Sequence, residues 1–124
     1  MTPTQRSLAK LRDEGWTVAI TERWNPFAKI RQDLFGFCDL LCISPSRGFL
    51  AVQTTSGSNV SARIAKIKSE PRAGIFIAAG GKIEVHGWRK IGERGKRKTW
   101  QCRVETLDAS SLSVWTGQRR ILAS

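Results

Sequence analysis

Apolar and polar positions alternate with two different periods along the first third of the chain. Leu8 and Leu11 mark one face of a helix predicted over residues 4–14. Its start, Thr2-Pro3-Thr4-Gln5, is typical of a capping box with proline at the first helical position, and Gly15 ends the helix. Residues 16–21 follow as a strand rich in β-branched residues.

The next apolar runs predict a hairpin over residues 38–55. Residues 38–44 form one strand, residues 45–48 the turn, and residues 49–55 the next strand. Side chains alternate across a strand, so Gln53 and Thr55 share a face and lie roughly 7 Å apart. The hairpin brings Asp39, which opens the first run, close to both of them. Residues 24–32, which contain Pro26, are predicted as a loop, and Gly36 as a bend or close approach.

The remaining pattern predicts two more helices and three more strands. Val60, Ile64 and Ile67 recur at helical spacing after a polar loop over residues 56–59 that offers an N-cap. Residues 73–79 are continuously apolar, as in a buried central strand, and residues 82–90 and 99–107 form two further strands. A short helix is expected from Asp108 or Ser110 through residue 115. We therefore predict a single α/β domain over residues 1–124, a mixed central sheet flanked by helices.

The charge of the chain favours a polyanionic partner. Twenty-one Lys and Arg against ten Asp and Glu give a net charge of +11, which attracts nucleic acid. A basic protein without such a partner is the alternative. No apolar run approaches the roughly 20 residues that span a bilayer, and no signal peptide precedes the first helix. We expect a cytoplasmic protein that does not bind membranes.

The cations fall into three groups that can contact phosphates. They are Lys29 and Arg31 in the predicted loop; Arg63, Lys66 and Lys68 on the second helix; and Arg89, Lys90, Arg94, Lys96, Arg97 and Lys98 around the last hairpin. Trp88 and Trp100 are interleaved with the third group, where they either stack on bases or pack under the sheet.

The three cysteines favour reduced core thiols over a disulfide or zinc. Cys38, Cys42 and Cys102 are an odd number, and all lie in strand-like runs. Cys38 and Cys42 lack the usual zinc pair spacing, and His86 has no second ligand nearby in sequence.

Asp39, Gln53 and Thr55 together are the candidate catalytic residues. A magnesium site for phosphodiester hydrolysis needs oxygen ligands clustered on a rigid edge. A carboxylate before one strand, opposite polar side chains at i and i+2 on the next, can build such an edge. Asp39, Gln53 and Asp33 are the candidate metal ligands.

The helix, Asp39, Gln53-Thr54-Thr55 and the basic helix after them resemble the PD-(D/E)xK nuclease superfamily, and within it archaeal Holliday-junction resolvases and small phage endonucleases. The resemblance covers residues 4–107 and implies a restriction-endonuclease-like fold. The family's Asp corresponds to Asp39, its Glu to Gln53, its Lys to Thr55, and its first-helix acid to Gln5. It further implies a Mg²⁺ site that also accepts Mn²⁺, a DNA substrate and a homodimer.

Three of these four positions depart from the family pattern: Gln5, Gln53 and Thr55. The amide oxygen of Gln53 can still face a metal, whereas the Thr55 hydroxyl orients water but carries no positive charge. Asp33 or Glu22 can replace a missing carboxylate. With one certain carboxylate, magnesium should bind more weakly than at a two-carboxylate site.

Each candidate also has a structural interpretation. Asp39 can cap a turn, Gln5 completes a capping box, and Gln53 and Thr55 can be ordinary strand residues. Asp33 pairs with Arg31 or Lys29 on the surface, and His86 is a solvated strand residue rather than a general base.

Three functions remain open at this point. The first is a magnesium-dependent, structure-selective endonuclease. The second is a catalytically inactive DNA-binding module of the same fold, and the third is an RNA-binding or ribosome-associated basic protein.

Overall fold

The computed structural model describes residues 1–92 and 94–109 of the chain. Its helices are α1 (Pro3–Asp13), α2 (Val60–Lys68) and α3 (Pro71–Ala78), with a 3₁₀ turn η1 (Gly57–Asn59). Its strands are β1 (Thr17–Ile20), β2 (Arg23–Asn25), β3 (Ile30–Gln32), β4 (Leu40–Ser44), β5 (Gly48–Ser56), β6 (Lys82–Ile91) and β7 (Thr99–Leu107). The predicted α/β class is confirmed.

Five strands form one mixed sheet in the order β1-β4-β5-β6-β7. β1, β4 and β5 make an antiparallel meander, β6 runs parallel to β5, and β7 returns antiparallel to β6. The parallel pair needs a crossover, which α2 and α3 supply. The mixed central sheet predicted from the sequence is therefore present.

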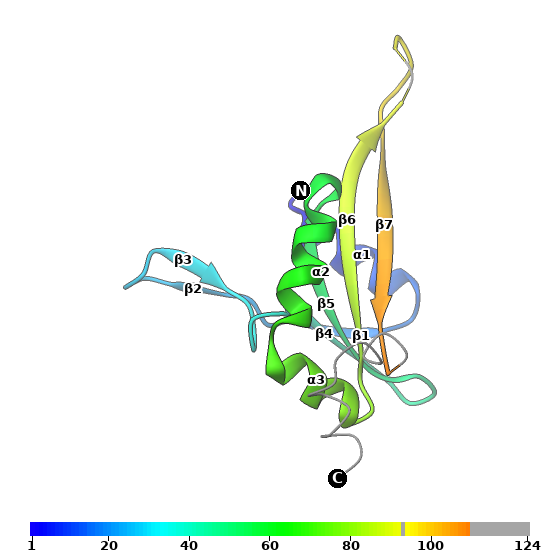
Figure 1. The fold of residues 1–124 in the computed structure, drawn as a ribbon. Coiled ribbons are helices and arrows are strands. Elements are labelled where there is room, and N and C mark those ends of the chain that lie inside the picture. Colours follow the sequence, from blue (N-terminus) through cyan, green and yellow to red (C-terminus); the bar gives the residue numbers. More distant parts are fainter. Residues whose placement is uncertain (93, 110–124) are drawn as a thin grey trace.

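Helices cover both faces of this sheet (Figure 1). Leu11 of α1 packs with Leu40, Cys42, Leu50 and Val52, so α1 covers one face. The opposite face lies under α2 and α3, with a core of Phe37, Cys38, Ala51, Val60, Ile67, Ala73, Ile77, Ile83, Val85 and Leu107. Alternate residues of β5 divide between the two cores, as its period of two requires.

The first two helices predicted from the sequence are present. Thr2 caps α1: its hydroxyl accepts a bond from the Gln5 backbone N–H at 3.2 Å, and the Gln5 Oε1 accepts from the Thr2 N–H at 2.9 Å. In α2, Val60 and Ile67 are fully buried and Ile64 is partly buried, so the predicted apolar face is confirmed. Asn59 makes no side-chain capping bond, because the residues before α2 form the turn η1 instead.

The predicted strand over residues 73–79 is wrong, because residues 73–78 lie in helix α3 and Ala79 is its C-cap. Pro71 occupies the first turn, and the Glu70 carboxylate caps the helix by accepting from the Arg72 N–H at 3.0 Å. A short, wholly apolar run has no period of its own, so the capping residues before it decide the outcome. Ala73 and Ile77 face the core.

The predicted loop over residues 24–32 is also wrong in part, because it contains the hairpin of β2 and β3. These strands pair only with each other, as a separate two-stranded sheet. Three residues are too few for an alternating pattern to predict a strand. The bend predicted at Gly36 is confirmed, with φ of +81° there and of +57° at Phe35.

The prediction of reduced core thiols is confirmed for two of the three cysteines. Cys38 and Cys42 are buried free thiols, and burial raises the pKa of Cys42 to about 12. Cys102 is half-buried and also free.

The predicted helix that ends at residue 115 lies outside the described residues. Within residues 1–92 and 94–109, no helix is both long enough and apolar enough to cross a bilayer.

A Gly87→Ala variant is expected to be destabilised by roughly 1–3 kcal/mol. A methyl group at position 87 would collide with Val60 Cγ2 of α2 and lie 3.2 Å from the Gly57 Cα. Urea denaturation followed by tryptophan fluorescence measures the loss. Adding Val60→Ala removes the colliding atom, so the double variant should lose less stability than the sum of the single variants. Additive losses would contradict this packing argument.

Candidate functional site

Asp39 and Gln53 meet where β4 begins. Asp39 directly precedes β4, and the register that pairs Leu40 with Val52 sets it opposite Gln53. The Asp39 Oδ2 accepts bonds from Gln53 Nε2 at 3.0 Å, from the Thr54 backbone N–H at 2.8 Å and from the Thr54 hydroxyl at 3.3 Å. The hairpin therefore brings these two candidate residues together as its spacing predicts.

Asp33 belongs to the same group of side chains. Gln53 Nε2 also donates to Asp33 Oδ2 at 2.9 Å, so one amide joins two carboxylates. Lys66 of α2 lies 3.6 Å from the same Asp33 oxygen. The predicted pairing of Asp33 with Arg31 or Lys29 is therefore wrong. We refer to Asp33, Asp39, Gln53 and Lys66 as the acidic centre.

Thr55 is not joined to this centre. It is 6% exposed, and within the described ranges no hydrogen bond links it to Asp39. Its hydroxyl group carries no positive charge. The cation beside the carboxylates comes instead from Lys66, on the helix that follows β5.

Burial raises the pKa of the Asp39 carboxyl group above its usual range. Loss of solvent is the largest cause, and the negative charges of Glu22 and Asp33 act in the same direction. The bonds from the Thr54 N–H and from Gln53 oppose the shift without cancelling it. Burial and nearby negative charge destabilise the ionised form of this carboxylate, so a positive ligand nearby would stabilise it.

The other end of the Gln53 amide has no partner. Its Oε1 atom is buried and accepts no hydrogen bond from the residues that the structure describes. A 180° rotation of the amide exchanges Oε1 with Nε2, which would turn an oxygen toward the two carboxylates. Two carboxylates and an amide oxygen are ligands that Mg²⁺ and Mn²⁺ accept, so the donor set fits such an ion.

The number of charged ligands is small. Across residues 1–92 and 94–109, no three His, Cys, Asp or Glu side chains gather closely enough to hold a metal ion by themselves. Any ion at the acidic centre would therefore depend on Gln53 for its third protein ligand.

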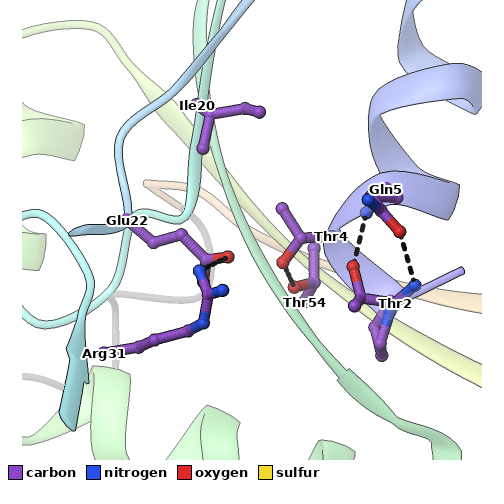
Figure 2. Close-up of a pocket in the computed structure, with 8 residues that line it drawn as sticks. Thr2, Thr4, Gln5, Ile20, Glu22, Arg31 and Thr54 are labelled. Carbon is purple, nitrogen blue, oxygen red and sulfur yellow. Dashed lines mark hydrogen bonds and ion pairs between the residues drawn. The ribbon is translucent and has the colours of Figure 1, made fainter. Parts of the chain in front are cut away.

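A pocket of about 350 Å³ opens next to the acidic centre, between the start of α1 and the β2–β3 hairpin (Figure 2). Thr54 lines it and shares a hydrogen bond of 2.8 Å with Thr4 of α1. Glu22 and Arg31 form an ion pair of 3.5 Å on the hairpin side of the pocket, opposite the start of α1 (Figure 2). Gln5 lines the same pocket, but its side chain is held in the capping box of α1. Glu22 is the acidic residue among those that line the pocket.

A second hollow, of about 450 Å³, lies on the other side of the hairpin root. Asp33, Arg31, Lys66 and Arg72 line it, and of these three cations Lys66 is the one paired with Asp33. Asp33 links this hollow to Gln53, and Thr54 links the first pocket to Asp39. Neither opening is lined by Asp39 or Gln53, and one hydrogen-bonded residue connects each opening to them.

The predicted nucleic-acid-binding cations lie mainly at the surface. Arg63 is half-buried, and the exposed ones are Lys29, Arg31, Lys66, Lys68, Arg89, Lys90, Arg94, Lys96, Arg97 and Lys98. Trp100 is 42% exposed, with the Arg6 guanidinium 3.8 Å from its ring centre and Lys90 Nζ at 5.6 Å. Trp88 is half-buried, as its packing alternative predicts.

The prediction that His86 is solvated is wrong. His86 is fully buried between α1 and the sheet, with Nδ1 2.9 Å from Ser7 Oγ and Nε2 2.8 Å from Glu84 Oε1. Trp88 Nε1 donates to the same Ser7 oxygen at 2.8 Å. This order of residues resembles a nucleophile–base–acid array, but Ser7 is 0% exposed and no substrate can reach it. The network therefore fastens α1 to β6.

Comparison of the chain with protein-family models, with curated proteins and with solved structures gave no match.

Proposed function

We propose that this chain is a DNA-binding, magnesium-dependent endonuclease of PD-(D/E)xK type that resembles Holliday-junction resolvases and hydrolyses phosphodiester bonds of branched or duplex DNA. The observation that carries the proposal is the single amide of Gln53 that joins Asp39 to Asp33 where β4 meets β5. The order of elements supports it: a helix, an antiparallel three-strand meander, a helical crossover and a parallel strand. A restriction-endonuclease-like fold and a homodimer that cuts two strands are parts of the same proposal.

Asp39, Asp33 and the Gln53 amide oxygen are the residues that would hold Mg²⁺ or Mn²⁺. Such an ion, when bound, polarises a phosphate oxygen and makes a bound water more acidic. Glu22, whose negative charge already acts on Asp39, is the residue that could supply a further carboxylate to the ion.

The surrounding cations hold the substrate in this proposal. Lys66 offers its ammonium group to a phosphate oxygen, and Arg31 and Arg72 line the same hollow. Thr55 keeps its predicted role of positioning water or phosphate from the neighbouring part of β5. The exposed cations of α2 and of the β6–β7 hairpin then contact the DNA backbone on either side.

A catalytically inactive DNA-binding module is the second candidate, and one observation favours it. Gln53 Nε2 already joins the two carboxylates by hydrogen bonds, in the place that a cation would take in an active site. A domain that needs no metal to hold this cluster together can bind DNA by its basic surface alone. An RNA-binding protein is the third candidate, because phosphate contacts do not distinguish RNA from DNA.

The test is cleavage of labelled linear, forked and four-way-junction DNA by the full chain with Mg²⁺, Mn²⁺ or EDTA. We expect cleavage with either metal, none with EDTA, and faster cleavage of branched DNA. Competition with structured RNA across a salt series ranks the two nucleic acids.

The other outcomes distinguish the candidates. Tight DNA binding without cleavage in either metal would overturn the enzyme and leave the binding module. If the chain retains RNA in preference to DNA as the salt concentration is raised, the proposal that DNA is the substrate is overturned. Cleavage that continues in EDTA would overturn the role of the acidic centre.

A further inference from the structure

The β2–β3 hairpin, residues 23–32, projects from the body of the molecule as an arm (Figure 1). Its strands make no pairing with the main sheet. Three of its large apolar side chains face solvent: Phe27 at the tip is 97% exposed, Trp24 57% and Ile30 50%. Exposed apolar groups gathered on one projecting element indicate a surface that binds a partner.

The tip that carries Phe27 is braced by hydrogen bonds. Asn25 Oδ1 accepts from the backbone N–H of Phe27 at 3.0 Å and of Ala28 at 3.1 Å. Asn25 Nδ2 donates across the hairpin to Gln32 Oε1 at 3.2 Å. A side chain on a braced turn loses little conformational freedom when it binds, so Phe27 is presented in advance for contact.

The charge of the arm identifies the chemistry of the partner. The arm carries Arg23, Lys29 and Arg31 and contains no acidic residue. A partner that complements it must offer negative charge together with flat apolar faces, as phosphates and bases do. A second copy of this chain would bring the same cations and the same net charge of +11, so it complements the arm poorly.

The root of the arm reaches the acidic centre. Arg31 of β3 lines both the pocket that contains Thr54 and the hollow that contains Asp33. Those two residues make the hydrogen bonds that lead to Asp39 and Gln53. A nucleic acid held at the centre therefore passes along the root of the arm, with the tip directed away from the body.

We propose that the arm is a nucleic-acid wedge: Phe27 stacks on a base that is unpaired or only partly stacked at a branch point, while Arg23 and Lys29 contact the flanking phosphates. The wedge gives the domain a preference for branched over linear DNA. The inference rests on the nucleic-acid binding of the proposed function and not on cleavage.

The test compares the full chain with Phe27→Ala, Phe27→Trp and Ile43→Ala, in EDTA so that no DNA is cut. Ile43 is a matched control, because it is 55% exposed but lies on β4 of the main sheet. Two readouts are made on a forked duplex and on a linear duplex: affinity by fluorescence anisotropy, and the fluorescence of 2-aminopurine placed at the branch point or within the paired region.

We expect Phe27→Ala to weaken binding to the fork by roughly 5- to 150-fold, the range of one base–aromatic stacking contact, with a much smaller effect on linear duplex. The change in 2-aminopurine fluorescence at the branch point should disappear with it. Phe27→Trp should keep both properties, and Ile43→Ala should resemble the wild type. Since Phe27 is almost wholly exposed, the melting temperature of Phe27→Ala should be unchanged, which separates lost binding from lost folding.

The remaining outcomes separate this inference from the proposed function. If the wild type binds both DNAs and Phe27→Ala binds them equally well, the wedge is overturned and the proposed function stands. If the wild type binds no nucleic acid, both fail. If Phe27→Ala changes only the sedimentation of the protein, or only its binding to anionic lipid vesicles, the arm contacts a second copy or a membrane surface, and the wedge is wrong.

Discussion

An Asp39→Asn variant is expected to lose metal-dependent cleavage by at least about a hundredfold, because a bound metal contributes several kcal/mol to the reaction. The same variant is expected to be more stable than the wild type at neutral pH. Asparagine keeps an oxygen where Asp39 Oδ2 accepts from Thr54 and Gln53 but carries no charge. Removing a buried charge at a functional site commonly raises stability by about 1 kcal/mol, or roughly 3–6 °C in melting temperature.

The gain in stability of Asp39→Asn over the wild type should depend on pH, in a direction fixed by the pKa of Asp39. Burial raises this pKa in the folded chain, so the folded state holds its proton at pH values where the unfolded state has lost it. The contribution of Asp39 to the stability of the wild type therefore falls as pH rises from the unfolded pKa, near 3.8, through the raised folded pKa. Asp39→Asn does not undergo this fall. Its advantage should be complete above that window and should vanish below it.

Melting temperatures of both proteins from pH 3 to pH 8, measured by circular dichroism, check this dependence. Asp13→Asn is the control, because it makes the same chemical change at an exposed residue that ends α1. It should cleave like the wild type and show little change in stability. An Asp39→Asn variant that still cuts would move the catalytic site elsewhere. One that melts lower at pH 7 would mean that the Asp39 charge stabilises the fold.

The sequence predicts those elements whose signals are local. The capping box of α1 lies within residues 2–5, and the meeting of Asp39 with Gln53 follows from a short hairpin whose turn fixes the register. In each case a few neighbouring residues contain the information that determines the geometry.

The features that the sequence did not predict depend on contacts between distant segments. Lys66 is recognisable as a surface cation beside the buried positions of α2, but no spacing rule shows that it faces Asp33, 33 positions earlier. His86 is buried against α1, where it shares a hydrogen bond with Ser7, 79 positions away in the sequence. The arm has strands of three residues, and its separation from the main sheet is visible only from its projection into solvent.

A Gln53→Glu variant, which places a carboxylate where the amide now joins Asp33 and Asp39, is expected to make the fold depend on metal. The wild-type amide donates to both Asp33 and Asp39, whereas a glutamate has no proton to donate at neutral pH. The variant therefore loses two hydrogen bonds and sets a third carboxylate against two others at a position that is 2% exposed. We expect a loss of about 3–5 kcal/mol at pH 7 without metal, partly recovered at lower pH as the cluster takes up a proton.

Divalent metal should reverse this loss, because three clustered carboxylates form a far better site for a hard cation than two carboxylates and an amide. At a hundred times its dissociation constant, an ion that binds only the folded state adds about 2.7 kcal/mol. Thermal melts with Mn²⁺, Mg²⁺ or EDTA measure this difference, and Gln101→Glu is the matched control. Gln101 is exposed on β7 and accepts from Arg89, so a charge there should neither destabilise the chain nor create a response to metal. If Gln53→Glu melts lower and metal does not raise its melting temperature, the geometry of the cluster does not accept a cation. The Gln53 amide would then be a permanent substitute for the ion, which is the arrangement that a DNA-binding module requires.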